Sequence, residues 1–183
     1  MSAGGTVAHG DRLRLFLALQ LPDDVVERLA AWQTAELPRG RLVPPEHLHV
    51  TLAFLGSRTG GDLPRVLDVL REVAAPAARP LLAPVGYRET RSVGMVVLDD
   101  EDGRSAALAD ALGRRLEELG LYRREQRPWL AHVTVLRFRE RPRLQPPLPL
   151  LEPFAPSEAA AYLSRLHPSG ARYEVLDSVA LGG

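Results

Sequence analysis

The stretch His49-Val50-Thr51-Leu52 recurs as His132-Val133-Thr134-Val135, 132 − 49 = 83 residues further along the chain. Each copy lies in a run rich in Val, Leu and Phe, which is the composition of a buried strand. Side chains alternate between the two faces of a strand, so the His and the Thr of each copy point the same way. Two copies that face each other would therefore bring together two imidazoles and two hydroxyls.

The segments around the two copies predict an internal duplication. We expect strands at 14–19, 47–55, 81–87, 94–98 and 130–138, and helices that follow residues 22, 62 and 103. The order strand, helix, His-x-Thr strand then occurs over 14–56 and again over 94–138. We interpret the two segments as similar β-α-β-type lobes.

The C-terminal part admits two interpretations. Segment 142–156 is rich in Pro and predicts an extended connector rather than a helix. Segments 159–166 and 172–176 predict a hairpin around Pro168-Ser169-Gly170. A helix over 157–163 is the alternative, because its Ala-rich sequence has high helix propensity.

Composition bounds the class of protein. The 183 residues suffice for one domain, which we place at 11–183 after a frayed tail at 1–10. No apolar run approaches the roughly 20 residues of a membrane span, and the start lacks the pattern of a signal peptide, so we expect a cytoplasmic protein without membrane partners. We also expect a monomer, since no heptad pattern or extra apolar helix face stands out.

Two missing residue types exclude several chemistries. The chain has no Cys, which excludes disulfides, thiol nucleophiles and Cys-rich zinc sites. It has no Lys either, so all 23 basic residues are Arg, and neither a lysyl-nucleotide ligase nor a Walker-A loop can be built. Net charge is zero, but segment 123–143 holds seven Arg against two Glu. That segment is either a solvated basic loop or a contact surface for phosphates.

The residue types of the two copies suit phosphodiester chemistry without metal. Imidazole has a pKa near ~6.5, so one His can accept a proton from an attacking hydroxyl while the other donates one to a leaving oxygen. The hydroxyls of Thr51 and Thr134 can donate to the non-bridging oxygens, where charge develops. Two His without a nearby third ligand would make a poor zinc site, so we expect no metal and no cofactor.

The longer runs that contain the motifs resemble a known superfamily. Arg41-Leu42-Val43-Pro44, then His49-Val50-Thr51-Leu52-Ala53-Phe54-Leu55-Gly56, and His132-Val133-Thr134-Val135-Leu136-Arg137 are similar to the 2H phosphoesterases. Within them the chain most resembles the bacterial and archaeal RNA 2′,3′-cyclic phosphodiesterases, also called 2′-5′ RNA ligases or LigT-like proteins. Segments 14–19, 164–166 and 170–173 share the resemblance, so it spans nearly the whole chain.

The resemblance implies a fold, an activity and a set of site residues. The fold would be α+β and bilobal, with two antiparallel-rich sheets that flank a central cleft. The activity would be hydrolysis of the 2′,3′-cyclic phosphate end of an RNA, tRNA fragments among the candidates, to a 2′-phosphate. His49 would protonate the leaving 3′-oxygen, His132 would activate water, and Thr51, Thr134 and Arg137 would hold the phosphoryl group. A 5′-hydroxyl in place of water would give an ATP-independent 2′-5′ link.

One residue in this set conflicts with simple strand geometry. Arg137 lies three residues after Thr134, so strict alternation places it on the opposite face. It reaches the cleft only if the strand bends, bulges or ends there, and otherwise it lies on the surface. His47 has the same parity as His49 but no counterpart in the second copy, so we expect it at the rim of the site.

Two other functions remain open from the sequence. The same site would also suit a small cyclic nucleotide or a 2′-5′ oligonucleotide. Alternatively, the protein would bind RNA ends without catalysis and stack bases on strand aromatics such as Phe54 and Trp129.

Overall fold

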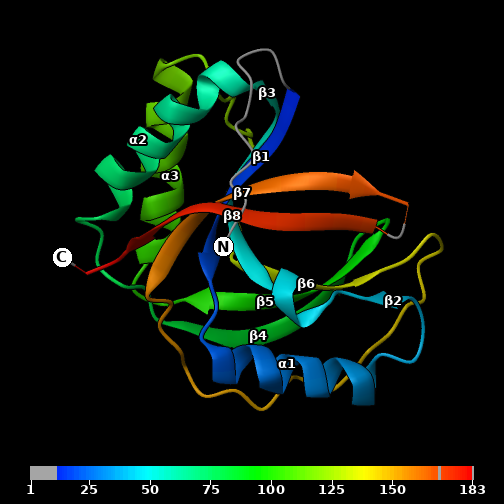
Figure 1. The fold of residues 1–183 in the computed structure, drawn as a ribbon. Coiled ribbons are helices and arrows are strands. Elements are labelled where there is room, and N and C mark those ends of the chain that lie inside the picture. Colours follow the sequence, from blue (N-terminus) through cyan, green and yellow to red (C-terminus); the bar gives the residue numbers. More distant parts are fainter. Residues whose placement is uncertain (1–11, 169, 183) are drawn as a thin grey trace, which may run out of the picture.

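The computed structural model describes residues 12–168 and 170–182. The tail expected at 1–10 and the turn residue Ser169 lie outside these residues, and the single domain over 11–183 stays a prediction. The described chain is α+β, a curled antiparallel sheet with helices packed against it (Figure 1). Its elements are β1 (Arg12–Gln20), α1 (Asp23–Glu36), β2 (Arg41–Leu42), η1 (Pro45–His47), β3 (His49–Thr59), η2 (Gly60–Asp62), α2 (Leu63–Ala74), β4 (Leu82–Glu89), β5 (Val93–Asp100), α3 (Arg104–Glu118), β6 (His132–Arg137), β7 (Glu158–His167) and β8 (Gly170–Ala180).

The sheet joins the two expected lobes through one narrow contact. Its strand order is β4-β5-β6-β3-β1-β7-β8, with β2 paired to β6. Val50↔Val133 is the pair between β3 and β6. The two sheets expected from the resemblance are thus two antiparallel halves of one continuous sheet, because the motif strands pair with each other at the centre.

The duplication is visible in the pairing. In the first copy β1 and β3 are antiparallel neighbours with α1 between them in sequence, and in the second copy β5 and β6 are antiparallel neighbours with α3 between them. Each of these two helices contacts the half of the sheet that contains the other copy. Trp32 of α1 donates from Nε1 to the carbonyl of Pro147 and lies beside Tyr87 of β4, whereas α3 contacts β3. Each helix thus packs toward the other half of the sheet, which ties the halves together.

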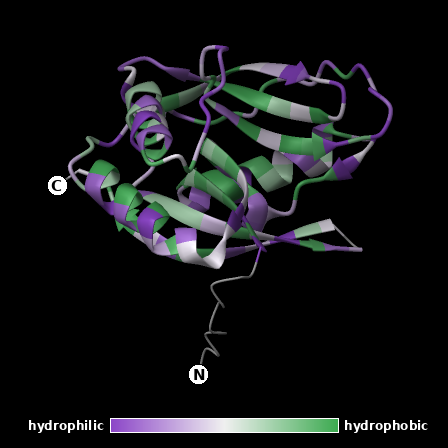
Figure 2. Ribbon diagram, turned by 90° about the horizontal axis from the view of Figure 1, so that it is seen from above, coloured by the Kyte–Doolittle hydropathy of each residue, from purple (hydrophilic) through white to green (hydrophobic). Residues whose placement is uncertain are grey.

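The helices bury one side each. In α2 the buried residues Val66, Val69, Leu70 and Ala74 recur at helical spacing, so they form one stripe. Seen from above, hydrophobic and hydrophilic residues fall on different sides of the helices (Figure 2). No helix in the described part of the chain is both long and apolar enough to span a membrane.

Two motif-strand boundaries differ from the prediction. The first was expected at 47–55 but runs from His49 to Thr59, because Pro44 and Pro45 start a 3-10 turn that includes His47, and because β1 pairs with the extended end. The second was expected at 130–138 but runs from His132 to Arg137.

The helical alternative for 157–163 is wrong. This segment belongs to β7, which pairs with β1 on one side and β8 on the other. Ala159, Ala160 and Ala161 are buried there. The two neighbouring strands satisfy its backbone, and this tertiary pairing outweighs the helix propensity of an Ala-rich run.

Candidate active site

The two motif strands present the same side chains to one face of the sheet. Both copies show the same burial over six residues, with the His, the Thr and the sixth residue accessible and the second, fourth and fifth buried. Val50 and Val133 are fully buried where the strands meet. His49, Thr51, His132 and Thr134 flank these two valines, so all four surround the crossing point on the opposite face.

Both imidazoles are held in the same orientation by the backbone. His49 Nδ1 lies 2.7 Å from the carbonyl oxygen of His47, and His132 Nδ1 lies 2.8 Å from that of Leu130. A carbonyl only accepts, so Nδ1 carries the proton in each ring and Nε2 is left for other partners. His49 Nε2 lies 3.0 Å from Thr51 Oγ1. Each copy thus offers one oriented Nε2 on the shared face.

His49 is packed among three aromatic rings. Its ring stacks on Phe16 with centroids 4.9 Å apart, on Tyr162 at 5.9 Å, and meets Tyr173 edge-on at 5.7 Å. Burial is the main reason that the pKa of His49 falls to about 4, and positive charge on His132, His47 and Arg137 lowers it further. The hydrogen bond to the His47 carbonyl acts in the opposite direction. Without a ligand, His49 is therefore neutral at pH 7.

A β-bulge decides the direction of Arg137. On β5, Met95 pairs with Thr134 and the adjacent Gly94 pairs with Leu136, so Val135 has no partner on that strand. The extra residue resets the alternation. Val135 and Leu136 are both buried, and Arg137 returns to the face of Thr134, where it lines the pocket. The strand bulge that Arg137 needs in order to reach the cleft is therefore present.

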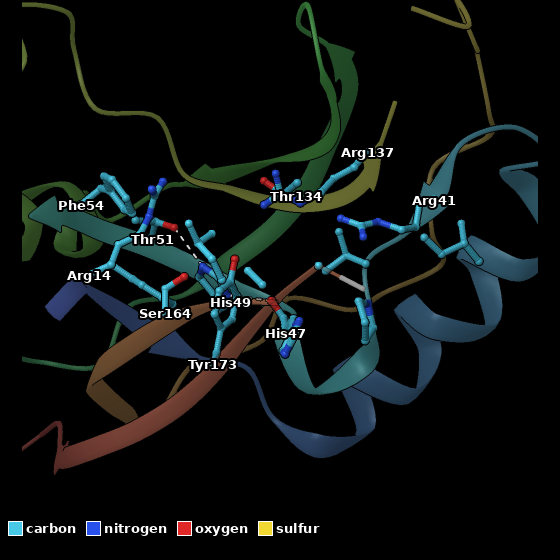
Figure 3. Close-up of a pocket in the computed structure, with 17 residues that line it drawn as sticks. Arg14, Arg41, His47, His49, Thr51, Phe54, Thr134, Arg137, Ser164 and Tyr173 are labelled. Atoms are coloured by element: carbon cyan, nitrogen blue, oxygen red, sulfur yellow. Dashed lines mark hydrogen bonds between the residues drawn. The ribbon is translucent and has the colours of Figure 1, made fainter. Parts of the chain in front are cut away.

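The first copy carries the same bulge. On β1, Leu17 pairs with Ala53 and Ala18 pairs with Thr51, which leaves Leu52 without a partner on that strand. The sixth residue here is Phe54, 45% exposed, with the guanidinium of Arg14 4.9 Å from its ring centroid. Phe54 is thus the counterpart of Arg137. Figure 3 shows the two at opposite ends of the site, with His49 and Thr51 between them.

Most predicted site residues line one cavity of about 510 Å³. Thr51, Thr134, Arg137 and His49 all lie in its wall, and His47 is there too, in agreement with its expected rim position. The remaining polar and aromatic lining residues are Arg14, Phe16, Arg41, Phe54, Ser164 and Tyr173. His132 lines an adjoining hollow instead, and this hollow shares Thr51 and Phe54 with the first.

The chain is similar in sequence and in fold to several known proteins. A family model described as LigT like Phosphoesterase matches residues 19–82. A Thermus thermophilus protein named RNA 2′,3′-cyclic phosphodiesterase is 34% identical, over 93% of this chain and 91% of its own length. The chain belongs to the LigT-like phosphoesterase family. An Escherichia coli protein of the same name is 28% identical over 92% of this chain and 96% of its own length. A crystal structure of a T. thermophilus protein superposes with a TM-score of 0.79 at 32% identity, over 92% of this chain and 97% of that one.

In this LigT-like phosphoesterase, three of the seven arginines of segment 123–143 pair with carboxylates of the described residues. Arg124 pairs with Asp110 and Glu117, Arg127 pairs with Glu125, and Arg141 pairs with the buried carboxylate of Glu89. In residues 12–168 and 170–182, Arg137 forms no ion pair. Arg137 lines the cavity, and its contact with a phosphate stays a prediction.

Several lining residues were missed by sequence reasoning. The sequence analysis names Phe54 only as a stacking aromatic of the binding alternative, although it occupies the place of Arg137 when the two copies are aligned. Arg14, Arg41 and Tyr173 lie in segments that carry the family resemblance, but no local pattern assigns them to the site, since they come from β1, β2 and β8 and meet the motif strands only through tertiary pairing.

Proposed function

We propose that this LigT-like phosphoesterase hydrolyses the 2′,3′-cyclic phosphate end of an RNA to a 2′-phosphate. The observation that carries the proposal is the pair of equally oriented imidazoles, each beside a Thr, on one face of the crossing motif strands. The names of the T. thermophilus and E. coli relatives support the substrate class. The RNA end, with tRNA fragments among the candidates, is then the partner of this pocket.

The proposed reaction is an in-line displacement at phosphorus. His132 Nε2 accepts a proton from a water molecule as the water oxygen bonds to phosphorus. The bond from phosphorus to the 3′-oxygen breaks, and His49 Nε2 gives its proton to that oxygen. The hydroxyls of Thr51 and Thr134 and the guanidinium of Arg137 hold the non-bridging oxygens, whose charge grows in the transition state. The assignment of donor and acceptor follows the family resemblance.

The donor role requires that His49 gain a proton when substrate binds. In the free site its pKa is about 4, so the neutral ring predominates at pH 7. The anionic phosphate brings an opposite charge next to the ring and raises that pKa. Substrate binding and proton uptake are therefore coupled at this residue. The faces of Phe16 and Tyr162 then stack against a cation, which favours the charged form once the phosphate is present.

The proposed reaction needs neither metal nor nucleotide. In the described part of the chain, no group of three His, Asp or Glu side chains is arranged to hold a metal ion. A phosphodiester displacement needs no redox or nucleotide cofactor when two imidazoles divide the proton transfers. The same site would join a 5′-hydroxyl end in place of water, which gives a 2′-5′ phosphodiester and needs no lysyl-nucleotide.

The adjoining hollow favours an RNA end over a cyclic mononucleotide. It continues from the first cavity at Thr51 and Phe54, and His132 faces it. Comparison of turnover of a cyclic mononucleotide with that of a cyclic-ended oligonucleotide distinguishes these substrates, and preference for the mononucleotide would contradict the RNA assignment.

The test uses an oligoribonucleotide that ends in a 2′,3′-cyclic phosphate, with EDTA present and ATP absent. We expect a 2′-phosphate product from the wild-type protein. A 3′-phosphate would keep the two-His chemistry but reverse the leaving group. Bound RNA without any product would instead favour the non-catalytic binding module.

A further inference from the structure

We infer that Gln33, a residue of α1 outside the pocket, is a positioning residue for Arg137. Its side-chain amide holds the backbone bulge that turns Arg137 toward the substrate. The inference rests on the proposed function for its catalytic consequence, but the geometry that carries it is independent of the substrate.

Gln33 is a buried polar side chain with both of its amide hydrogens engaged. The residue is 1% exposed, and Nε2 donates to the carbonyl of Val135 at 2.6 Å and to that of Val43 at 3.1 Å. A buried amide is costly unless its hydrogen bonds are made. Here both acceptors are backbone carbonyls from other segments of the chain, so the side chain fastens α1 to β6 and to the chain after β2.

The carbonyl that Gln33 holds belongs to the bulged residue itself. Val135 has no partner on β5, and its oxygen accepts from the backbone N–H of Val43 at 3.0 Å as well as from Gln33. Two donors therefore fix the direction of this one peptide group. A bulge left without such bonds could relax toward regular pairing, because regular alternation is the default of a strand.

The direction of this peptide decides which face Arg137 occupies. With the bulge, Arg137 lies on the face of Thr134, and without it the side chain would lie on the buried face, with Val133 and Val135. In the described residues no carboxylate pairs with Arg137, so no ion pair fixes its side chain. The backbone, and through it Gln33, thus sets where this guanidinium points.

The test is a double-mutant cycle on kcat/KM for the cyclic-ended oligonucleotide. Gln33→Met keeps the length of the side chain and removes the donors, and Val43 still satisfies the Val135 carbonyl, so the fold should survive. We expect Gln33→Met to lower kcat/KM by roughly 10- to 100-fold, as for a small misplacement of a substrate contact. Arg137→Ala should lower it by about 10²–10³-fold. In the double variant the loss should equal that of Arg137→Ala alone.

Two further variants separate positioning from stability. Gln33→Asn keeps the amide but shortens its reach, and should reproduce the loss. Val66→Ala, at a buried position of α2, should lower the melting temperature and leave kcat/KM unchanged. Full activity in folded Gln33→Met, or losses that multiply in the double variant, would overturn the inference.

The same double-mutant cycle can be measured on the affinity for inorganic phosphate, which involves no turnover. By isothermal titration calorimetry, Gln33→Met should weaken phosphate binding in the wild-type background and have no effect in Arg137→Ala. If the wild-type protein binds phosphate with this pattern but does not hydrolyse the oligonucleotide, the proposed function fails and the role of Gln33 stands. If the calorimetric losses are additive while hydrolysis occurs, the role of Gln33 fails and the function stands.

Discussion

Val50 and Val133 pair directly across β3 and β6, at the point where the two halves of the sheet meet. Each valine lies between the His and the Thr of its own copy, so this buried pair relates the two halves of the site. The two copies differ at the sixth residue, which is Phe54 in one copy and Arg137 in the other. The site therefore has the guanidinium of Arg137 at one end and an aromatic end at the other, where the Phe54 ring lies beside Arg14, so its two ends would contact different parts of a substrate.

Replacement of either motif histidine should abolish turnover. His49→Ala and His132→Ala each remove one of the two proton-transfer groups, and the proposed mechanism needs both. The measurement is product formation from the cyclic-ended oligonucleotide, with circular dichroism to check the fold. The matched control is His167→Ala at the exposed end of β7, which should retain the wild-type rate. Full activity in either motif variant would refute the two-His mechanism.

Loss of either motif hydroxyl should slow the reaction without abolishing it. Thr51→Val and Thr134→Val keep the shape of the side chain and remove a donor to the phosphoryl oxygens, which we expect to lower kcat by about 10²–10³-fold. In the wild-type protein His49 Nε2 lies 3.0 Å from the Thr51 hydroxyl, so Thr51→Val also removes this contact to the imidazole. Single-turnover rates at saturating substrate measure the effect. An unchanged rate in both variants would show that the hydroxyls do not stabilise the transition state.

The pKa of His49 should move upward when phosphate binds. In the free protein we expect titration near the value of about 4 that burial imposes. Inorganic phosphate places negative charge beside the ring and should raise the pKa toward or above the ordinary ~6.5. NMR titration of the imidazole Cε1 proton, with and without phosphate, measures both values. A pKa that stays near 4 in the complex would transfer the donor role to His132.

Acidification should weaken the fold through the same residue. Because the pKa of His49 is lowered from 6.5 to about 4 in the folded state, the unfolded chain binds the proton first as pH falls. Well above pH 6.5 His49 is neutral in both states and does not change the free energy of unfolding. As the pH falls from 6.5 toward 4, the free energy of unfolding decreases, by about 2 kcal/mol at pH 5. Urea unfolding at pH 7, 6 and 5, compared with His49→Gln, isolates this contribution. Equal pH dependence in the two proteins would contradict the buried neutral ring.

The aromatic end of the site should contribute to binding of longer substrates. Phe54→Leu removes an exposed ring that lies between the two hollows, and loss of one base stack costs about 1–3 kcal/mol. We expect a higher KM for the cyclic-ended oligonucleotide, little change in phosphate affinity, and recovery in Phe54→Tyr. Steady-state kinetics and calorimetry together test this. A loss of phosphate affinity equal to the rise in KM would place the effect at the phosphate and not at a base.

Several features could be predicted because they depend on local pattern. The duplicated His-x-Thr, its period-two alternation and the helices between the strands follow from residue type and spacing, and the structure confirms the α+β class. His49, Thr51 and Thr134 line one pocket, and their roles stay a prediction. The strand type of β7 could not be predicted in the same way. Its Ala-rich sequence favours a helix, and only pairing with β1 and β8 reverses that preference.

The sequence alone determined which groups are available: the duplicated motif supplies two imidazoles and two hydroxyls, and the chain has no thiol and no Lys. The pKa values and the orientations of the site residues depend on the folded arrangement. Burial against Phe16 and Tyr162 lowers the pKa of His49, and the bulge at Val135 brings Arg137 to the site face. Residue type is a local property, whereas burial and strand register depend on partners far away in the chain, as the bond from Gln33 to Val135 illustrates.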